Sequence, residues 1–436
     1  MYQFRDPIHG FIEVSDLELK IIDTPAFQRL RNIRQLSTTY LVYPGAEHSR
    51  FGHSLGVMHL VTKAFESALE NYKRTNGVDL FDVPTQAWYK QILRLIALVH
   101  DLGHAPFSHG SEKLFVEGKE HEDYTYSIIT DKLISKHIKK IGKKFQEEHG
   151  NAYTIDPDLL WLIYGDKNPE FKERYIMPDF MFLKSFMDSD IDCDKMDYLL
   201  RDSYYCGVNY GSFDLNRLLA SLNIYVCEKE NIMQLALERG GIHAFEEFVI
   251  ARYFMFIQVY FHKTRRYLDK LLVDCIADIL QGGKYPKNTD EYLMYDDNYI
   301  LQKIRENSKK NGDIADRAKK FINREVMTCV YETKPHEKDS SDVKLYRSIR
   351  NKLQSLQGCD IFEDNPRKLS HMIPTLSGYD EENGKGIPIL DRYSRDPVSV
   401  IEESILLKSL HEKIDIRRIY IDKQHAEKAK RIINNY

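Results

Sequence analysis

The pair His100-Asp101 closes the apolar stretch LRLIALVHDLGHAPFSH, so that an imidazole and a carboxylate stand side by side at the end of an apolar helix. A buried carboxylate requires a cation or a full set of hydrogen bonds. Two further segments offer the same kinds of side chain, since His53 lies in RFGHSLGVMHL and Asp194 lies in DIDCDKMDYLLRDS. We therefore expect three helical segments to converge on a divalent metal ion, with His53, His100, Asp101 and Asp194 as its ligands.

This ligand set indicates a hydrolytic metal rather than a structural one. Two Asp side chains neutralise a divalent ion, while the His nitrogens complete its coordination without further negative charge, so the ion can polarise a phosphoryl oxygen or activate water. The sequence leaves the ion open among Mn, Mg, Fe, Ni and Zn. An isolated His-Asp dipeptide is most often an ordinary helix end, but His104, His109 and His121 follow closely and favour the metal interpretation.

Most of the chain before Gly282 has the apolar periodicity of helices. Apolar residues recur at three- and four-residue spacing in the segments 17–23, 24–36, 54–74, 85–103 and 243–280. After Gly282-Gly283 the sequence becomes rich in Lys, Asn, Asp and Tyr, and short strand-like runs follow at 326–333, 386–391 and 414–422. We expect a mainly α helical bundle over residues 1–282 and a smaller α+β accessory region over residues 283–436.

Charge, cysteine usage and hydropathy narrow the setting in which the protein works. The net charge of −4 argues against a protein built to coat nucleic acid, although a nucleic-acid partner stays open as the less favoured alternative. The six cysteines form no CxxC pair, which indicates neither a zinc ribbon nor a disulfide framework. No signal pattern and no apolar run of about 18 residues is present, so we expect a cytoplasmic protein without a membrane span.

The segment after Asp194 predicts one wall of a pocket. Residues 194, 198 and 202 are one helical turn apart, so Asp194, Tyr198 and Asp202 share a face with Lys195 beside them. The alternative is that Asp197, Arg201 and Asp202 form ion pairs on the surface.

Basic residues at helical spacing offer sites for phosphate. Arg50 precedes His53 by about one turn, so its guanidinium could reach a phosphate held at the metal. Arg252, Phe256, Tyr260 and Lys263 repeat at spacings of four, four and three residues, which places two cations and two aromatic rings on one stripe. By its pattern alone this stripe favours a helix core with basic residues reaching out from its edge.

The order His53, His100-Asp101, Asp194 resembles that of the HD-domain phosphohydrolases. The motifs HDLGHAPFSH, RFGHSLGV, IDTPAFQRLRNIRQL and DKMDYLLRDSYYCGV are similar to those of the subgroup containing the deoxynucleoside triphosphate triphosphohydrolases, and the resemblance runs from Asp6 to Arg266. It implies an HD-domain helical bundle, a divalent metal cofactor and a homo-oligomer, either a dimer or a tetramer.

The resemblance also implies roles for individual residues. Arg50 matches a contact to substrate phosphate, and Arg252 and Lys263 match phosphate or subunit contacts. The positions that match contacts to the deoxyribose are Gln35, Leu36, Tyr198 and Asp202, and Leu36 would exclude a 2′-hydroxyl. By its pattern alone, Leu36 is equally an ordinary core residue. The positions that match the phosphate and proton-transfer group are His104, His109, Glu112 and His121, of which His121 is the acid toward the leaving oxygen and Glu112 orients an imidazole.

Some features of the family remain open in this chain. Asp23, Gln28 and Arg31 match a nucleotide activator site of some relatives, whereas Arg5 departs from it; Asp23 could instead cap the helix that begins at Thr24-Pro25. We expect an enzyme that hydrolyses a deoxynucleoside triphosphate to the deoxynucleoside and triphosphate. The alternatives are an HD phosphodiesterase or nuclease acting on nucleic acid, and a nucleotide-sensing binding module with negligible turnover.

Overall fold

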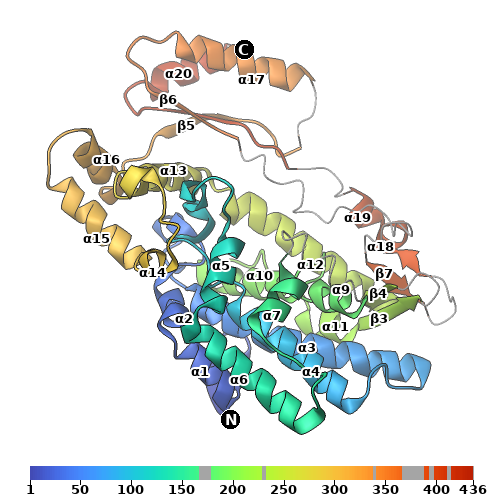
Figure 1. The fold of residues 1–436 in the computed structure, drawn as a ribbon. Helices are drawn as coiled ribbons and strands as arrows, with labels where there is room; N and C mark the ends of the chain where they lie inside the picture. Colours follow the sequence, from blue (N-terminus) through green and yellow to red (C-terminus); the bar gives the residue numbers. More distant parts are fainter. Residues whose placement is uncertain are drawn as a thin grey trace.

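The protein is a bundle of helices with small sheets at its edges (Figure 1). A computed structural model describes residues 1–165, 178–227, 232–336, 340–365, 387–391, 397–409 and 414–435. The described helices of the bundle are α1 (Asp16–Ile22), α2 (Pro25–Arg29), α3 (Arg50–Asn76), α4 (Val83–Val99), α5 (His121–Thr130), α6 (Lys132–His149), α7 (Pro157–Tyr164), α9 (Pro178–Ser185), α10 (Cys193–Cys206), α11 (Leu215–Ala220), α12 (Ile242–Met255) and α13 (Lys263–Ala277). The mainly α architecture confirms the prediction from the apolar periodicity.

Helices α3 and α4 run side by side through the middle of the bundle, and α10 packs on α3 (Figure 1). Each of these helices begins or ends at a residue suited to that place. The Asp82 carboxylate caps α4 by accepting a hydrogen bond of 2.9 Å from the amide of Thr85. At the other end of α4, His100 is the first residue past the helix, which places the His100-Asp101 pair at a buried helix terminus.

Three small sheets complete the structure. The strands are β1 (Tyr2–Asp6) and β2 (Gly10–Val14) in one hairpin, β3 (Leu222–Cys227), β4 (Ile232–Glu238), β7 (Pro388–Leu390) and β8 (Val398–Ser399) in a second sheet, and β5 (Thr328–Glu332), β9 (Arg418–Ile421) and β6 (Ile361–Asp364) in a third. The order of the third sheet is β5-β9-β6, antiparallel throughout. The runs predicted as strands therefore contain β5, β7 and β9, whereas the hairpin β1-β2 and the pair β3-β4 were missed.

After residue 282 the chain first adds helices to the bundle and then builds a lobe at its far end (Figure 1). The helices there are α14 (Thr289–Leu293), α15 (Asp297–Ser308), α16 (Asp313–Ile322), α17 (Ser340–Gln354), α18 (Val400–Glu403), α19 (Ile405–Ser409) and α20 (Ala426–Ile433). Helix α16 packs on α13, while α17 and α20 pack together beside the β5-β9-β6 sheet. The smaller C-terminal region thus has the predicted mixed composition, and the domain boundary at residue 282 stays a prediction.

Two predicted helices are shorter than their apolar patterns. The segment 24–36 is helical only to Arg29, because the chain passes through a 3-10 turn and becomes extended at Ile33. The long segment 243–280 is broken by a π-helical turn over Phe256–Tyr260, after which α13 begins at Lys263. The expectation of one continuous stripe from Arg252 to Lys263 was therefore wrong, since an irregular turn separates the two helices.

The cap of α2 is Thr24 and not Asp23. The Thr24 hydroxyl accepts a hydrogen bond from the amide of Phe27, and Pro25 takes the first helical position, where no amide proton is needed. Asp23 is the residue that ends α1. In the part of the chain that the structure describes, none of the helices is both long enough and apolar enough to cross a membrane.

Candidate metal centre

Three helix ends bring the four predicted ligands to one point. His53 lies in the first turn of α3, His100 follows α4, and Asp194 lies in the first turn of α10. The ligand atoms of His53, His100 and Asp194 all lie within 4.8 Å of one another. The His53 Nε2 is 2.9 Å from Asp194 Oδ1 and 3.6 Å from Asp101 Oδ2, and the His100 Nε2 is 3.2 Å from Asp101 Oδ1. A single divalent ion could contact two imidazoles and two carboxylates here.

The ring of His100 turns its Nε2 toward this point. Its Nδ1 lies 2.7 Å from the Ala97 carbonyl oxygen, which can only accept, so Nδ1 carries a proton. The Nε2 is buried and has no hydrogen-bond partner among the residues that the structure describes. Burial lowers the pKa of His100, but the charges of Asp101 and Asp194 raise it, so positive charge at Nε2, from a proton or from a metal ion, is favoured.

His53 is oriented by a residue that the sequence analysis did not select. Its Nδ1 donates to Asp197 Oδ2 at 2.8 Å, which turns Nε2 toward Asp194. Asp197 is held in turn by two hydrogen bonds from Arg201, at 2.8 and 2.9 Å, and by the ring of His9 at 2.7 Å. Metal-binding histidines commonly donate their second N–H to a carboxylate in this way.

Asp197, Arg201 and Asp202 are at most 1% exposed, so the alternative that they form surface ion pairs was wrong. The signal for Asp197 was its place three residues after Asp194, on a neighbouring part of the same helix face. A second signal was Gly56, three residues after His53. A Cβ at Gly56 would lie 1.9 Å from Asp197 Oδ1, so glycine at this position leaves room for the Asp197 carboxylate against α3.

The electrostatics of the cluster call for a cation. Burial lowers the pKa of His53, but hydrogen bonds to Asp194 and Asp197 and the charge of Asp101 raise it to about 10. Burial alone would raise the pKa of Asp101, yet the nearby charges of Arg50, His100 and His104 hold it well below its usual range. The carboxylates therefore stay ionised and attract positive charge, which a proton on His53 or a divalent metal can supply.

A second group of imidazoles stands directly beside the first. Glu112 lies 2.5 Å from His104 Nδ1, 2.7 Å from His109 Nδ1 and 3.7 Å from His121 Nδ1. The rings of His104 and His121 stack with centroids 4.0 Å apart. His104 Nε2 also lies 3.0 Å from Asp101 Oδ1, so one carboxylate contacts both groups.

His121 begins α5, and it reaches this group because of a close backbone approach. A Cβ at Gly103 would lie 1.9 Å from the His121 carbonyl oxygen, so glycine is required in the turn after the His100-Asp101 pair. Burial lowers the pKa of His121, and the charges of His104 and His109 lower it further, which keeps its imidazole neutral. An anion bound beside His121 would favour the imidazolium form and raise this pKa.

Two of the residues matched to the sugar, Tyr198 and Asp202 of α10, contact Tyr260 in the turn after α12. The Tyr260 hydroxyl donates to Asp202 Oδ2 at 2.7 Å, and the Tyr260 ring stands edge-on to Tyr198 at 6.2 Å. Leu36 is 6% exposed, and Gln35 Oε1 is buried with no hydrogen-bond donor in the described ranges. His48, to which the sequence analysis assigned no role, bonds the other oxygen of Asp202 at 2.8 Å.

Three predicted substrate-binding residues, Arg50, Lys195 and Arg252, are buried or paired with acids. Arg50 donates to Asp101 Oδ2 at 2.6 Å and to Ser108 Oγ at 2.7 Å. The Lys195 ammonium contacts the Asp192 carboxylate and donates to the Ser189 carbonyl at 3.0 Å. Arg252 is 4% exposed and lies near enough to Lys195 and Tyr198 for their charges to interact.

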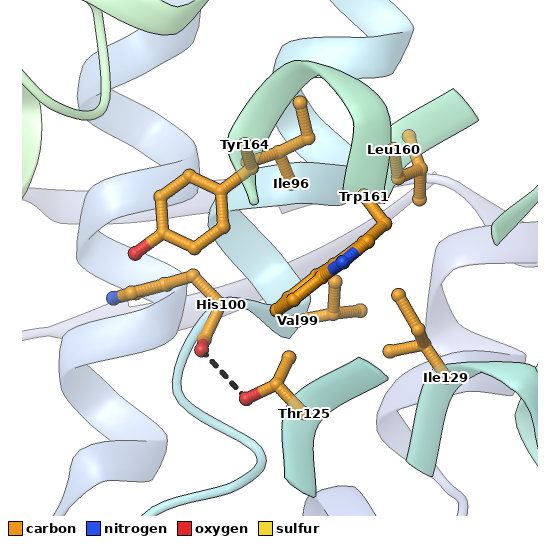
Figure 2. A pocket seen from close by; sticks show the side chains of 8 residues that line it. All are labelled: Ile96, Val99, His100, Thr125, Ile129, Leu160, Trp161 and Tyr164. Atoms are coloured by element: carbon orange, nitrogen blue, oxygen red, sulfur yellow. Dashed lines mark hydrogen bonds between the residues drawn. The ribbon is translucent and has the colours of Figure 1, made fainter. Parts of the chain in front are cut away.

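An apolar hollow borders His100 on the side of α4, α5 and α7 (Figure 2). Trp161 and Tyr164 of α7 line it, and the Thr125 hydroxyl donates to the His100 carbonyl at 3.1 Å. The Tyr164 ring lies edge-on to His100 at 6.3 Å. Burial raises the pKa of Tyr164, and the charges of Asp194 and Asp101 raise it further, so its hydroxyl stays neutral. Tyr164 is a site residue without a sequence signal.

Asp297, from the beginning of α15, joins two loops of the centre. Its Oδ2 accepts from the amide of Arg34 at 3.0 Å, and its Oδ1 accepts from the amide of Phe107 at 2.7 Å. Arg34 precedes Gln35, and Phe107 opens the left-handed turn that leads to His109. A carboxylate from beyond residue 282 therefore fixes the backbone on both sides of the site.

Asp297 should make stability depend on pH. Burial raises its pKa to about 7, although both amides and Arg34 favour the carboxylate form. Between about pH 4 and pH 7 the folded state holds a proton on Asp297 that the unfolded state has already released. The free energy of unfolding therefore falls as pH rises from about 4 to about 7, by a few kcal/mol at most. Denaturant unfolding across this range should show a smaller pH slope for Asp297→Asn than for wild type. The control Asp313→Asn, at an exposed position in the first turn of α16, should keep the wild-type slope.

Comparisons with known proteins agree with this geometry. The HD domain family matches residues 50–172, and the HD associated region matches residues 213–344. The uncharacterized protein YwfO of Bacillus subtilis is 31% identical, over 78% of this chain and 74% of its own length. The human deoxynucleoside triphosphate triphosphohydrolase SAMHD1 is 29% identical, over 77% of this chain and 56% of its own.

The fold is also found among solved structures. A hypothetical protein from Aquifex aeolicus superimposes with a TM-score of 0.74 and 28% identity, over 99% of both chains. The family matches cover the segments that carry His53, His100-Asp101 and the second imidazole group, and the relatives cover most of the chain. This chain belongs to the HD-domain phosphohydrolases.

Proposed function

We propose that this protein hydrolyses deoxynucleoside triphosphates to the deoxynucleoside and triphosphate, with a divalent metal held by His53, His100, Asp101 and Asp194. The observation that carries the proposal is Asp101, which contacts the first imidazole group through His100 and the second through His104. The metal could then act on the phosphoryl group of a phosphate ester while the proton donor acts on the leaving oxygen of the same ester. The family match and the similarity to an enzyme named for this reaction support the same proposal.

The reaction requires one bond to form and one to break. A divalent ion at this centre would supply Lewis acidity for a phosphoryl oxygen and activate a water molecule. Water oxygen attacks the α-phosphorus and releases its proton to solvent, and the bond from phosphorus to the 5′-oxygen breaks. The leaving oxygen takes a proton from His121, which the bound anion favours in its imidazolium form. Glu112 holds the neighbouring rings of His104 and His109 in place. Arg50, next to Asp101, would balance negative charge on the phosphates.

The sugar pocket provides the sharpest prediction of substrate. Leu36, which the family resemblance matches to a sugar contact together with Tyr198, offers a 2′-hydroxyl no hydrogen-bond partner, and burying an unpaired hydroxyl costs ~1–3 kcal/mol. Deoxynucleotides should therefore be preferred over ribonucleotides by roughly 5- to 150-fold in kcat/KM. Leu36→Gly should lower this ratio more than it lowers turnover of deoxynucleotides, and Leu17→Ala, in α1, is the control that should leave the ratio unchanged.

Chromatography of products from each dNTP, each rNTP and single-stranded DNA, with Mn²⁺ or Mg²⁺, tests the proposal. Release of intact triphosphate from dNTPs alone supports it. Shortened DNA would identify a nuclease instead, and tight nucleotide binding without product would identify a sensing module. Equal hydrolysis of dNTPs and rNTPs would contradict the sugar-pocket argument.

We further propose that the enzyme acts in the cytoplasm as a homodimer or homotetramer and that a nucleotide can activate it. Of the residues matched to the activator site, Arg31 donates to Gln28 at 2.8 Å, and its guanidinium lies over the ring of Phe51 at 3.5 Å. Phe51 follows Arg50 in α3. A ligand bound at Arg31 would therefore contact the residue next to Arg50, the proposed phosphate contact. Light scattering with and without each dNTP would test the oligomeric state, and initial rates with each dNTP added as a second nucleotide would test activation.

A further inference from the structure

A second cluster of metal-binding side chains lies in the C-terminal lobe, apart from the catalytic centre. It consists of Cys359, Asp422 and His425, whose thiol, carboxylate and imidazole ligand atoms all lie within 4.8 Å of one another. The side chains of Asp422 and His425 are 25% and 24% exposed, so the cluster is shielded and still reachable from solvent. Neither the proposed reaction nor the sugar pocket uses any of these residues.

Strand pairing places the three residues together. Strands β6 and β9 are antiparallel with Ile361 opposite Ile421, so the residues just before β6 face those just after β9. The amide of Asp360 donates to Asp422 Oδ2 at 3.1 Å, which fixes the segment that carries Cys359. The amide of His425 donates to Asp422 Oδ1 at 3.1 Å, directly before α20 begins. Backbone geometry, and not only side-chain contact, holds this arrangement.

The chemistry of the three groups favours a metal over a nucleophile. The Nδ1 of His425 lies 2.9 Å from both Asp422 oxygens, so this nitrogen faces the carboxylate. The Cys359 thiol donates to the Asp360 carbonyl oxygen, with the two atoms 3.7 Å apart. A thiol without an activating base is a poor nucleophile at neutral pH. A divalent ion can replace its proton, and thiolate, carboxylate and neutral imidazole together carry the two negative charges that such an ion requires.

We propose that Cys359, Asp422 and His425 bind a zinc-type divalent cation, with a water molecule in the fourth position. Sulfur, nitrogen and oxygen donors in one tetrahedral site are typical of Zn²⁺. The ion would join the beginning of β6, the end of β9 and the beginning of α20. The core beneath this sheet is small, with Ile419, Ile421 and Ala429 among its buried residues, and small cores gain most from a metal staple.

Cobalt substitution distinguishes this site from the catalytic centre in the intact protein. The predicted ligands of the catalytic centre are only His and Asp, so a thiolate-to-Co²⁺ charge-transfer band reports the lobe site alone. We expect this band in the Co²⁺-loaded wild type and its complete loss in Cys359→Ser. The control Cys329→Ser, on neighbouring β5, should retain the band. His425→Ala should weaken Co²⁺ binding at this site at least about 10-fold.

Zinc content and melting temperature provide independent measurements. Elemental analysis of zinc-loaded protein should fall by one equivalent per chain in Cys359→Ser, with helical content by circular dichroism unchanged. A chelator removes the catalytic metal from both proteins, and from wild type it should also remove the lobe metal. It should therefore lower the melting temperature of wild type more than that of Cys359→Ser. A charge-transfer band that survives in Cys359→Ser, or its absence from wild type, would overturn the assignment, whatever the outcome for triphosphohydrolase activity.

Discussion

Asp194→Ala and His53→Ala should each lose the bound metal and reduce turnover by at least about a thousandfold. Asp194 Oδ1 is the oxygen nearest to His53 Nε2, at 2.9 Å, and it also lies 3.8 Å from His100 Nε2. Removing either ligand leaves too few donors to hold the ion. Metal catalysis of this kind contributes several kcal/mol to the transition state, and each 1.36 kcal/mol is tenfold in rate. Elemental analysis and steady-state kinetics measure both losses.

Two further variants make this test specific. Asp197→Asn removes the negative charge behind His53 without removing a ligand, so metal affinity should fall by about 10- to 100-fold and not be abolished. Asp79→Ala is the control, because the exposed Asp79 carboxylate lies 2.9 Å from the Lys73 ammonium near the C-terminal end of α3, away from the metal ligands. Full metal occupancy in both Asp194→Ala and His53→Ala would show that the ligand assignment is wrong.

His121→Ala should slow hydrolysis by about 100- to 10,000-fold while leaving metal content intact, since general acid catalysis contributes about this much. His121 lies 3.7 Å from Glu112 and stacks on His104, outside the contacts to Asp194. The measurements are kcat at saturating substrate and bound metal per chain. His137→Ala, on α6, is the matched control and should behave as wild type.

A leaving-group comparison separates proton donation from a merely structural role. A nitrophenyl phosphodiester has a leaving group that departs without protonation, so the effect of His121→Ala should shrink strongly with this substrate. An equal loss with both substrates would mean that His121 positions its neighbours. If His121→Ala retained the full rate with dNTPs, the proton would have to come from His109, which is exposed and bonds the same Glu112.

The sequence by itself determined the helical class and the chemistry of the metal ligands. Apolar spacing is a local property, and it located α3 and α4 because each helix buries one continuous face. The His100-Asp101 pair could be recognised because it interrupts an apolar helix, where a charge has no place without a partner. Helix ends were harder to place, since Thr24 and the turn after Arg29 depend on caps and on the packing of neighbouring segments.

Only the tertiary structure decided which residues support the ligands. Asp197 and His9 are 188 residues apart in sequence, yet they meet behind His53, where Gly56 leaves room for the Asp197 carboxylate. Asp297 joins Arg34 to Phe107 through a fold that no local pattern predicts. An Asp one helical turn from an Arg looks the same in sequence whether the carboxylate is buried in a hydrogen-bond network or exposed in a surface ion pair. The difference between them is burial and partner geometry, which long-range packing alone sets.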